Sequence, residues 1–71
     1  MNNLTSSEYH EMAKQLHALN IVIFDIEEKI EYGSTERAEL YKTRTQLNRA
    51  INSINQLETA AFINETSVHS L

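Results

Sequence analysis

The segment that most resembles a metal-dependent active site is His10-Glu11. A zinc-protease helix needs a second histidine four residues after the first, so that both rings reach one ion. Position 14 holds Lys14, whose ammonium group would repel the ion. His17 lies about 10 Å further along a helix, which is too far to share a metal with His10. We therefore expect surface histidines, no bound metal and no cofactor.

The acidic residues near the middle of the chain are the other candidates for chemistry: Asp25, Glu27, Glu28 and Glu31. Carboxylates bind divalent cations or transfer protons when they converge inside a dry pocket. These four spread around the end of one helix, with no second element to close a site. The sequence also has no glycine-rich phosphate loop and no histidine beside a plausible nucleophile. We therefore expect a solvated acidic face, no catalytic residue and no enzymatic activity.

The length and composition limit how the chain can be stabilised. A domain of 71 residues buries only about 60% of its unfolded surface, so a core of its own is marginal. Chains this small usually add disulfides, a metal or a partner chain. The absence of cysteine removes disulfides and fits a reducing cytosol. Association with another protein is the support that remains.

Charge and hydropathy argue against two kinds of partner. The formal net charge is −4, whereas nucleic-acid-binding domains usually carry a basic face. The longest unbroken apolar run, Ile21–Phe24, is far shorter than the roughly 20 residues of a membrane span. The opening residues are polar and lack the basic region and apolar run of a secretory signal. We expect no nucleic acid, no membrane and a cytoplasmic location.

The first predicted helix covers residues 6–32. Thr5-Ser6-Ser7-Glu8 matches a capping box, and Leu4 and Tyr9 occupy the positions of a hydrophobic staple. Gly33 is a natural stop signal, because glycine readily adopts the left-handed conformation that ends many helices. Between these signals, apolar residues recur at alternating steps of three and four, as in a coiled coil. This first stripe is Tyr9, Met12, Leu16, Leu19, Ile23, Ile26 and Ile30.

The second predicted helix covers residues 35–62, after a turn at 33–34. Ser34 or Thr35 can cap it, and Glu36 suits the positive end of its dipole. The polar tail, 63–71, has no periodicity, so we expect it to fray. The apolar stripe of this helix is Leu40, Leu47, Ile51 and Ile54, with Ala50, Leu57 and Ala61 beside it and with Arg44 and Glu58 at two heptad positions.

A turn this short makes the two helices antiparallel neighbours. The expected fold is therefore all-α, an antiparallel two-helix hairpin resembling a coiled coil. The acidic end of the first helix lies beside the basic start of the second, which favours this register. We expect the contact between the helices to consist of Leu16, Leu19, Ile23 and Ile26 against Leu47, Ile51 and Ile54.

A second apolar stripe on the first helix is the best candidate for a partner-binding site. It consists of Ala13, His17, Ile21 and Phe24. The second helix covers only one side of the first, so this stripe is expected to stay exposed, and contiguous exposed apolar surface marks interaction sites. A homodimeric four-helix bundle that buries the same stripe is the alternative.

Four segments carry a resemblance to a known family: Lys14-Gln15-Leu16, Ile26-Glu27-Glu28-Lys29-Ile30-Glu31-Tyr32-Gly33, Glu39-Leu40-Tyr41-Lys42 and Gln46-Leu47-Asn48-Arg49-Ala50-Ile51-Asn52-Ser53-Ile54. In these segments the chain resembles the small co-chaperones of type III secretion needle proteins, the YscE, PscE, EscE and SsaE group. The resemblance extends over about residues 12–63 and includes the glycine turn and the tyrosine soon after it.

This resemblance implies a helical hairpin that pairs with a larger helical-repeat chaperone. The two proteins together would hold a needle subunit monomeric in the bacterial cytoplasm until export, in a virulence-associated secretion system. The small member would chiefly support the larger chaperone. The family supplies no contact residues for this chain, so the partner-binding prediction rests on the second stripe.

Two other functions stay open from the residues alone. One is a homodimeric helical-bundle regulator. The other is a bundle that sequesters a nucleotide, in which a tyrosine stacks on the base and a basic side chain pairs with the phosphate. The residues available for that role are Tyr9, Tyr32, Tyr41, Lys14, Lys42 and Arg44.

Overall fold

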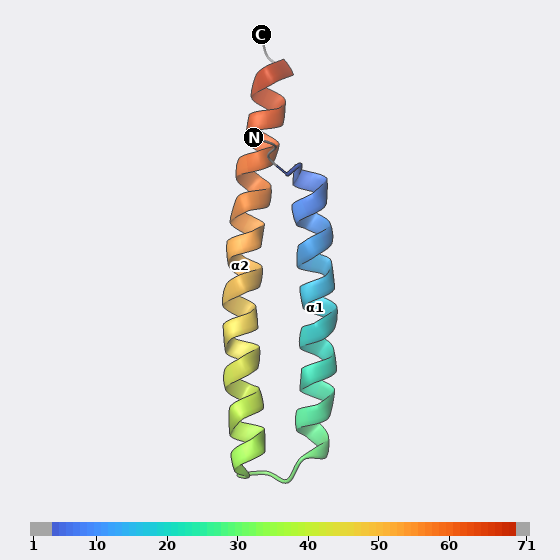
Figure 1. Cartoon of the computed structure of the whole chain (residues 1–71), viewed down its shortest axis with the longest axis vertical. Helices are drawn as coiled ribbons and strands as arrows, with labels where there is room; N and C mark the ends of the chain where they lie inside the picture. The colour runs from blue at the N-terminus through green and yellow to red at the C-terminus, as the bar shows by residue number, and fades with distance from the viewer. Residues whose placement is uncertain (1–3, 70–71) are drawn as a thin grey trace.

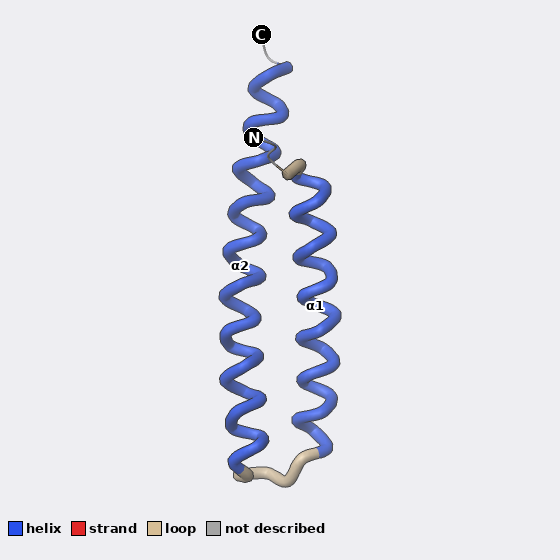
Figure 2. Tube along the Cα trace, in the orientation of Figure 1, coloured by secondary structure: helices blue, strands red, loops and turns tan. Residues whose placement is uncertain are grey.

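The computed structural model describes residues 4–69, which form two antiparallel α-helices joined by a short turn (Figure 1). Helix α1 spans Ser6–Lys29 and helix α2 spans Thr35–His69. The helices lie side by side along the whole of α1, and α2 continues beyond the start of α1 (Figure 2). The molecule measures 58 × 20 × 14 Å. The predicted all-α hairpin is confirmed, and the described residues contain no strand.

Helix α1 begins at the predicted capping box. The backbone N–H of Glu8 donates to Thr5 Oγ1 at 3.2 Å, and the backbone N–H of Thr5 donates to Glu8 Oε1 at 2.9 Å. Two N–H groups that have no partner within the helix are thereby satisfied. The local sequence is therefore sufficient to fix where α1 starts.

Helix α1 ends three residues earlier than predicted. Its last residue is Lys29, and Ile30 turns to an extended conformation. Arg37 Nη1 donates to the carbonyl of Ile30 at 3.1 Å, so a side chain of α2 satisfies a carbonyl at the end of α1. Gly33 has a φ of +83°, as a left-handed residue should, but it lies within the turn rather than directly after the helix.

Helix α2 is longer than predicted. The Ser34 hydroxyl accepts from the Arg37 backbone N–H at 3.2 Å, which confirms Ser34 as the cap. The helix then runs to His69, so the prediction of a frayed tail from residue 63 is wrong up to residue 69, and residues 70–71 lie outside the described part. No glycine or proline follows Gly33 to stop the helix.

The contact between the helices includes Leu16 and Ile23 as predicted, but the contacting face of α1 is rotated away from the other predicted residues. Met12, Leu19 and Ile26 are 40%, 48% and 44% exposed, so the predicted packing of Leu19 and Ile26 is wrong. The side chains that face α2, all buried or half-buried, are Ser6, Tyr9, Ala13, Leu16, Asn20, Ile23, Glu27 and Ile30. Helix α1 is thus rotated, and the polar side chains Ser6, Asn20 and Glu27 enter the contact.

Very little apolar surface is fully buried. Within the described residues, the buried hydrophobic side chains are Ala13 and Ile51 alone. The predicted stripe of α2 does face α1, because Leu40, Leu47 and Ile54 are half-buried beside the buried Ile51. Burial of apolar surface is the main stabilising contribution to a fold, at about 25 cal/mol for each Å² buried. A single hairpin that buries so little apolar surface is therefore weakly stabilised.

A carboxylate bridge closes the open end of the hairpin. The backbone N–H and the hydroxyl of Ser6 donate to Glu65 Oε2 and Oε1, each at 2.8 Å. The acceptor lies at the N-terminus of α1, where the helix dipole also favours a negative charge. The donations from the Ser6 backbone and then from its hydroxyl lower the pKa of Glu65 below its usual value of 4.5.

We expect this bridge to weaken in acid. Because the folded-state pKa of Glu65 is lowered, its contribution to stability is complete above pH 4.5 and is lost as the pH falls through the lowered pKa. The protection of the first-turn amides of α1 against hydrogen exchange, measured relative to the intrinsic exchange rate at each pH, should therefore fall in acid, and less so in Glu65→Gln. An NMR titration that puts the pKa of Glu65 at or above its usual value would contradict this prediction.

Candidate protein-binding surfaces

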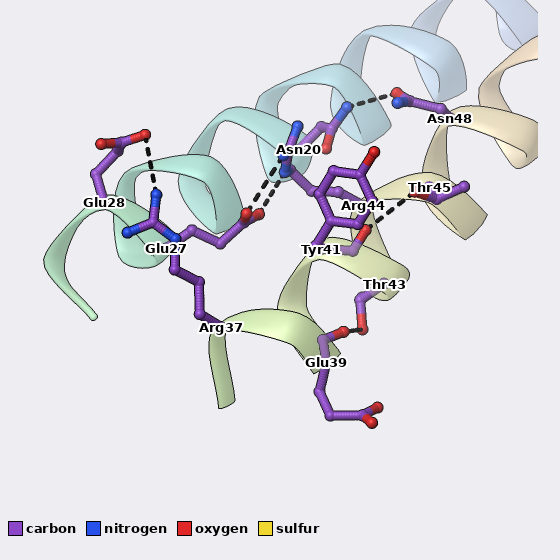
Figure 3. A network of polar contacts seen from close by, with 10 residues as sticks. All are labelled: Asn20, Glu27, Glu28, Arg37, Glu39, Tyr41, Thr43, Arg44, Thr45 and Asn48. Atoms are coloured by element: carbon purple, nitrogen blue, oxygen red, sulfur yellow. Dashed lines mark hydrogen bonds and ion pairs between the residues drawn. The ribbon is translucent and has the colours of Figure 1, made fainter. Parts of the chain in front are cut away.

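Two arginines of α2 hold the loop end of α1 (Figure 3). The Arg44 guanidinium forms a two-pronged ion pair with Glu27, Nε with Oε2 and Nη2 with Oε1 at 3.3 Å. Arg37 Nη2 lies 3.7 Å from Glu28 Oε1. The predicted attraction between the acidic end of the first helix and the basic start of the second is present. These pairs set the register of the hairpin at its loop end.

The prediction that all four acidic residues form a solvated face is wrong for Glu27. The Glu27 side chain is only 5% exposed and its Arg44 partner 21% exposed. A charge buried to this extent is tolerated only when it is paired and hydrogen-bonded. Arg44 occupies a heptad position of the second helix, but Glu27 lies outside the apolar stripe of the first, so periodicity alone does not reveal that they meet.

Arg44 also lies between two aromatic rings. Its Cζ atom is 5.0 Å from the ring centroid of Phe24 and 5.4 Å from that of Tyr41. Both distances suit cation–π interactions. The hydrogen bond to Glu27 raises the pKa of Arg44, with desolvation acting in the opposite direction. Arg44 is therefore a fixed cation that covers part of Phe24 and ties it to α2.

Asn20 contributes a second polar contact between the helices. Its Nδ2 atom donates to Asn48 Oδ1 at 2.7 Å (Figure 3). Its own Oδ1 is buried and has no hydrogen-bond partner among the described residues. Asn20 and Glu27 are seven residues apart on the same line of α1, so both polar contacts lie on the face that meets α2.

Three of the four predicted partner-binding residues lie together on one face. His17, Ile21 and Phe24 line a shallow hollow of about 220 Å³ with Asn20 and Arg44. Ile21 is 63% exposed and Phe24 is 45% exposed. We call this surface, defined by His17, Ile21 and Phe24, the Phe24 face.

The placement of Ala13 on an exposed stripe is wrong. Ala13 is only 4% exposed and lies in the contact with α2. It is seven residues before Asn20 and fourteen before Glu27, so it shares their line along the helix. Ala13 is therefore part of the hairpin contact rather than of a free surface.

The residues considered for metal or phosphate chemistry mostly have protein partners. His10 Nδ1 lies 3.4 Å from Glu58 Oε2, and Lys14 Nζ lies 3.9 Å from Glu11 Oε2. Lys42 Nζ is 3.3 Å from Glu39, and Arg44 is held by Glu27. Across the described part of the chain, histidine, aspartate and glutamate nowhere form a group of three suited to a metal ion. Because Arg44 is already paired, phosphate binding there would have to break a buried ion pair.

Within residues 4–69, neither helix is apolar enough over a sufficient length to cross a membrane.

Comparisons with protein-family models, curated proteins and solved structures found no match to this chain. The resemblance to type III secretion co-chaperones therefore rests on the quoted sequence segments alone, and that family assignment stays a prediction.

Proposed function

We propose that this chain is a non-enzymatic binding protein whose exposed apolar surface docks on another helical protein. In its specific form, the proposal is a co-chaperone that binds and stabilises a larger helical-repeat chaperone in the bacterial cytoplasm. Through that chaperone it would help keep a type III secretion needle subunit monomeric before export. The specific form follows from the sequence resemblance, whereas the general form rests on the distribution of apolar surface.

One observation carries the general form. The middle of α1 exposes large apolar side chains on the Phe24 face, where Ile21 is 63% exposed and Phe24 is 45% exposed. Monomeric soluble proteins rarely leave contiguous apolar patches uncovered unless the patch binds something. A helix with such a surface suits insertion into a hydrophobic groove, a common mode of helix recognition.

The Phe24 face has the features of an interface centre. Large aromatic and arginine side chains usually dominate binding energy, and they lie near the middle of the contact. Phe24 and Arg44 are in contact here, and the ion pair with Glu27 fixes the arginine. The Phe24 ring is therefore held in place before the partner arrives, which reduces the entropy lost on binding.

We expect Phe24→Asp to abolish co-purification with the helical-repeat chaperone and to leave the chain helical. Loss of a buried phenylalanine removes about 1.5–3 kcal/mol of apolar burial, which corresponds to roughly a 10- to 150-fold loss of affinity. The measurement is co-expression with the affinity-tagged chaperone and a needle subunit, followed by circular dichroism of the free chain.

Phe62→Asp is the matched control, because Phe62 is 57% exposed on α2 and lies outside the Phe24 face. It should keep the complex. If Phe24→Asp also keeps the complex, the interface lies on another face. If the folded wild-type chain forms no complex with any type III helical-repeat chaperone, the co-chaperone assignment is wrong, whichever residues are changed.

A further inference from the structure

Both helices carry an uncharged heptad stripe that a single hairpin leaves partly exposed. The first stripe was given above, and none of its seven members is charged. Helix α2 carries an equivalent series with steps of three and four, and it is also free of charge. This α2 heptad is Leu40, Thr43, Leu47, Ala50, Ile54, Leu57 and Ala61.

The two stripes lie on the same side of the hairpin. The hydrogen bond from Asn20 to Asn48 and the stacking of Arg44 on Phe24 mark one side. Successive residues of a helix are rotated by about 100°. Leu19 and Ile26 are therefore on the flank of α1 away from Phe24. By the same rotation, Ala50 and Leu57 are on the flank of α2 away from Asn48.

The register brings these residues together in layers. It is set by the bridges from Ser6 to Glu65, from Asn20 to Asn48 and from Glu27 to Arg44. It places residues of α1 and α2 at equal heights along the hairpin in three pairs, which we call the open layers. The open layers are Met12 with Leu57, Leu19 with Ala50, and Ile26 with Thr43, and all six residues are exposed.

We propose that a second copy of this chain covers the open layers, so that two hairpins form a four-helix bundle. In such bundles each core layer takes one residue from each of four helices. Each open layer here supplies two, and a two-fold related copy supplies the other two. Large and small residues alternate as close packing requires, since Leu19 is paired with Ala50 and Ile26 with Thr43.

The shape and charge of this face fit a second hairpin. The face is two helices wide, and a single added helix would leave its outer parts uncovered. Beside the open layers, the middle of the face is bordered by the uncharged side chains Gln15, Val22 and Gln46, whereas Lys29 and Glu39 lie toward the loop with opposite charge. Glu36 also lies near the loop, one heptad before Thr43, and Glu8 lies at the other end of the face, one heptad before Gln15. Charge is thus confined to the ends of the face, and two such faces meet through an uncharged middle, although each chain carries a net charge of −4.

The contact within the hairpin already has the pattern of a bundle. Polar side chains that flank the apolar core of a coiled coil form the pairs between adjacent helices. Here these flanking positions are Ser6, Asn20 and Glu27 on α1, each hydrogen-bonded or ion-paired to α2. The rotation of α1 thus directs its apolar stripe partly toward α2 and partly toward the core that two hairpins would share. This face is separate from the Phe24 face, so the inference does not depend on the proposed function.

Sedimentation equilibrium of the full chain tests the inference. We expect the wild type to have twice the mass of the chain at micromolar concentration, and Leu19→Asp to dissociate at least tenfold more readily. Ile21→Asp is the matched control, because Ile21 is on the same helix but on the other flank, and it should stay dimeric. A monomeric wild type, or equal loss of the dimer in both variants, would overturn the inference.

Oxidation of Met12 provides a second test that does not require a variant to fold. Met12 lies in an open layer and is 40% exposed in a single hairpin. Peroxide should oxidise it several-fold more slowly at concentrations where the chain is associated than at high dilution. An associated chain whose Met12 reacts as fast as free methionine would show that the copies meet on another face.

Discussion

Arg44→Met is expected to lower the free energy of unfolding by about 3–5 kcal/mol. Removing one member of a buried ion pair leaves the other charge without compensation. The carboxylate left behind is Glu27, whose side chain is 5% exposed. For a chain of this size, each kcal/mol shifts the melting temperature by roughly 4–8 °C. The midpoint should therefore fall by more than about 12 °C in thermal unfolding followed by circular dichroism.

The double variant Glu27→Leu/Arg44→Met should recover most of this loss, because well-packed apolar residues often replace a buried ion pair without cost. Lys42→Met is the matched control. Its pair with Glu39 is exposed, and such pairs contribute about 1 kcal/mol or less. If Arg44→Met melts within a degree or two of wild type, Glu27 is not held as a buried charge.

The sequence predicted those parts of the fold that depend on neighbouring residues. The capping box at Thr5, the cap at Ser34 and the left-handed Gly33 each depend on a few consecutive residues, and all three are present. The antiparallel arrangement followed from the short turn and the charges beside it. Local rules were sufficient for these features because each concerns contacts within one or two helical turns.

The rotation of α1 could not be predicted in this way. Apolar periodicity favoured a contact through Leu19 and Ile26, whereas the structure places Asn20 and Glu27 between the helices. Each of these polar residues is stabilised there by a partner on the other helix, 28 and 17 residues away respectively. Such pairings are invisible to a local pattern, and Ala13 was misassigned for the same reason.

The length of α2 was also underestimated for a physical reason. Residues beyond 62 are polar and have no apolar period, which is typical of a fraying end. In the structure Glu65 is tied to the first turn of α1 by two hydrogen bonds from Ser6. The bond partners are separated by 59 residues, so only the folded hairpin brings them together.

The candidate surfaces were partly foreseen. His17, Ile21 and Phe24 were identified from the surplus of apolar residues, and the Phe24 face does bring them together. The open layers were not predicted, because the whole apolar stripe of α1, including Leu19 and Ile26, was expected to pack against α2. Recognising them required the register and the rotation, which come from the polar pairs.

We infer that a single hairpin does not complete its own core, and the concentration dependence of thermal unfolding tests this inference most directly. If folding requires a second copy, mass action raises the stability of the folded dimer as chain concentration increases. Over a hundredfold range of concentration, we expect the melting midpoint of the wild-type chain to rise by roughly 5–10 °C. A midpoint that stays constant over that range would contradict the account, because it would show that a single hairpin is sufficient for the stability of this protein.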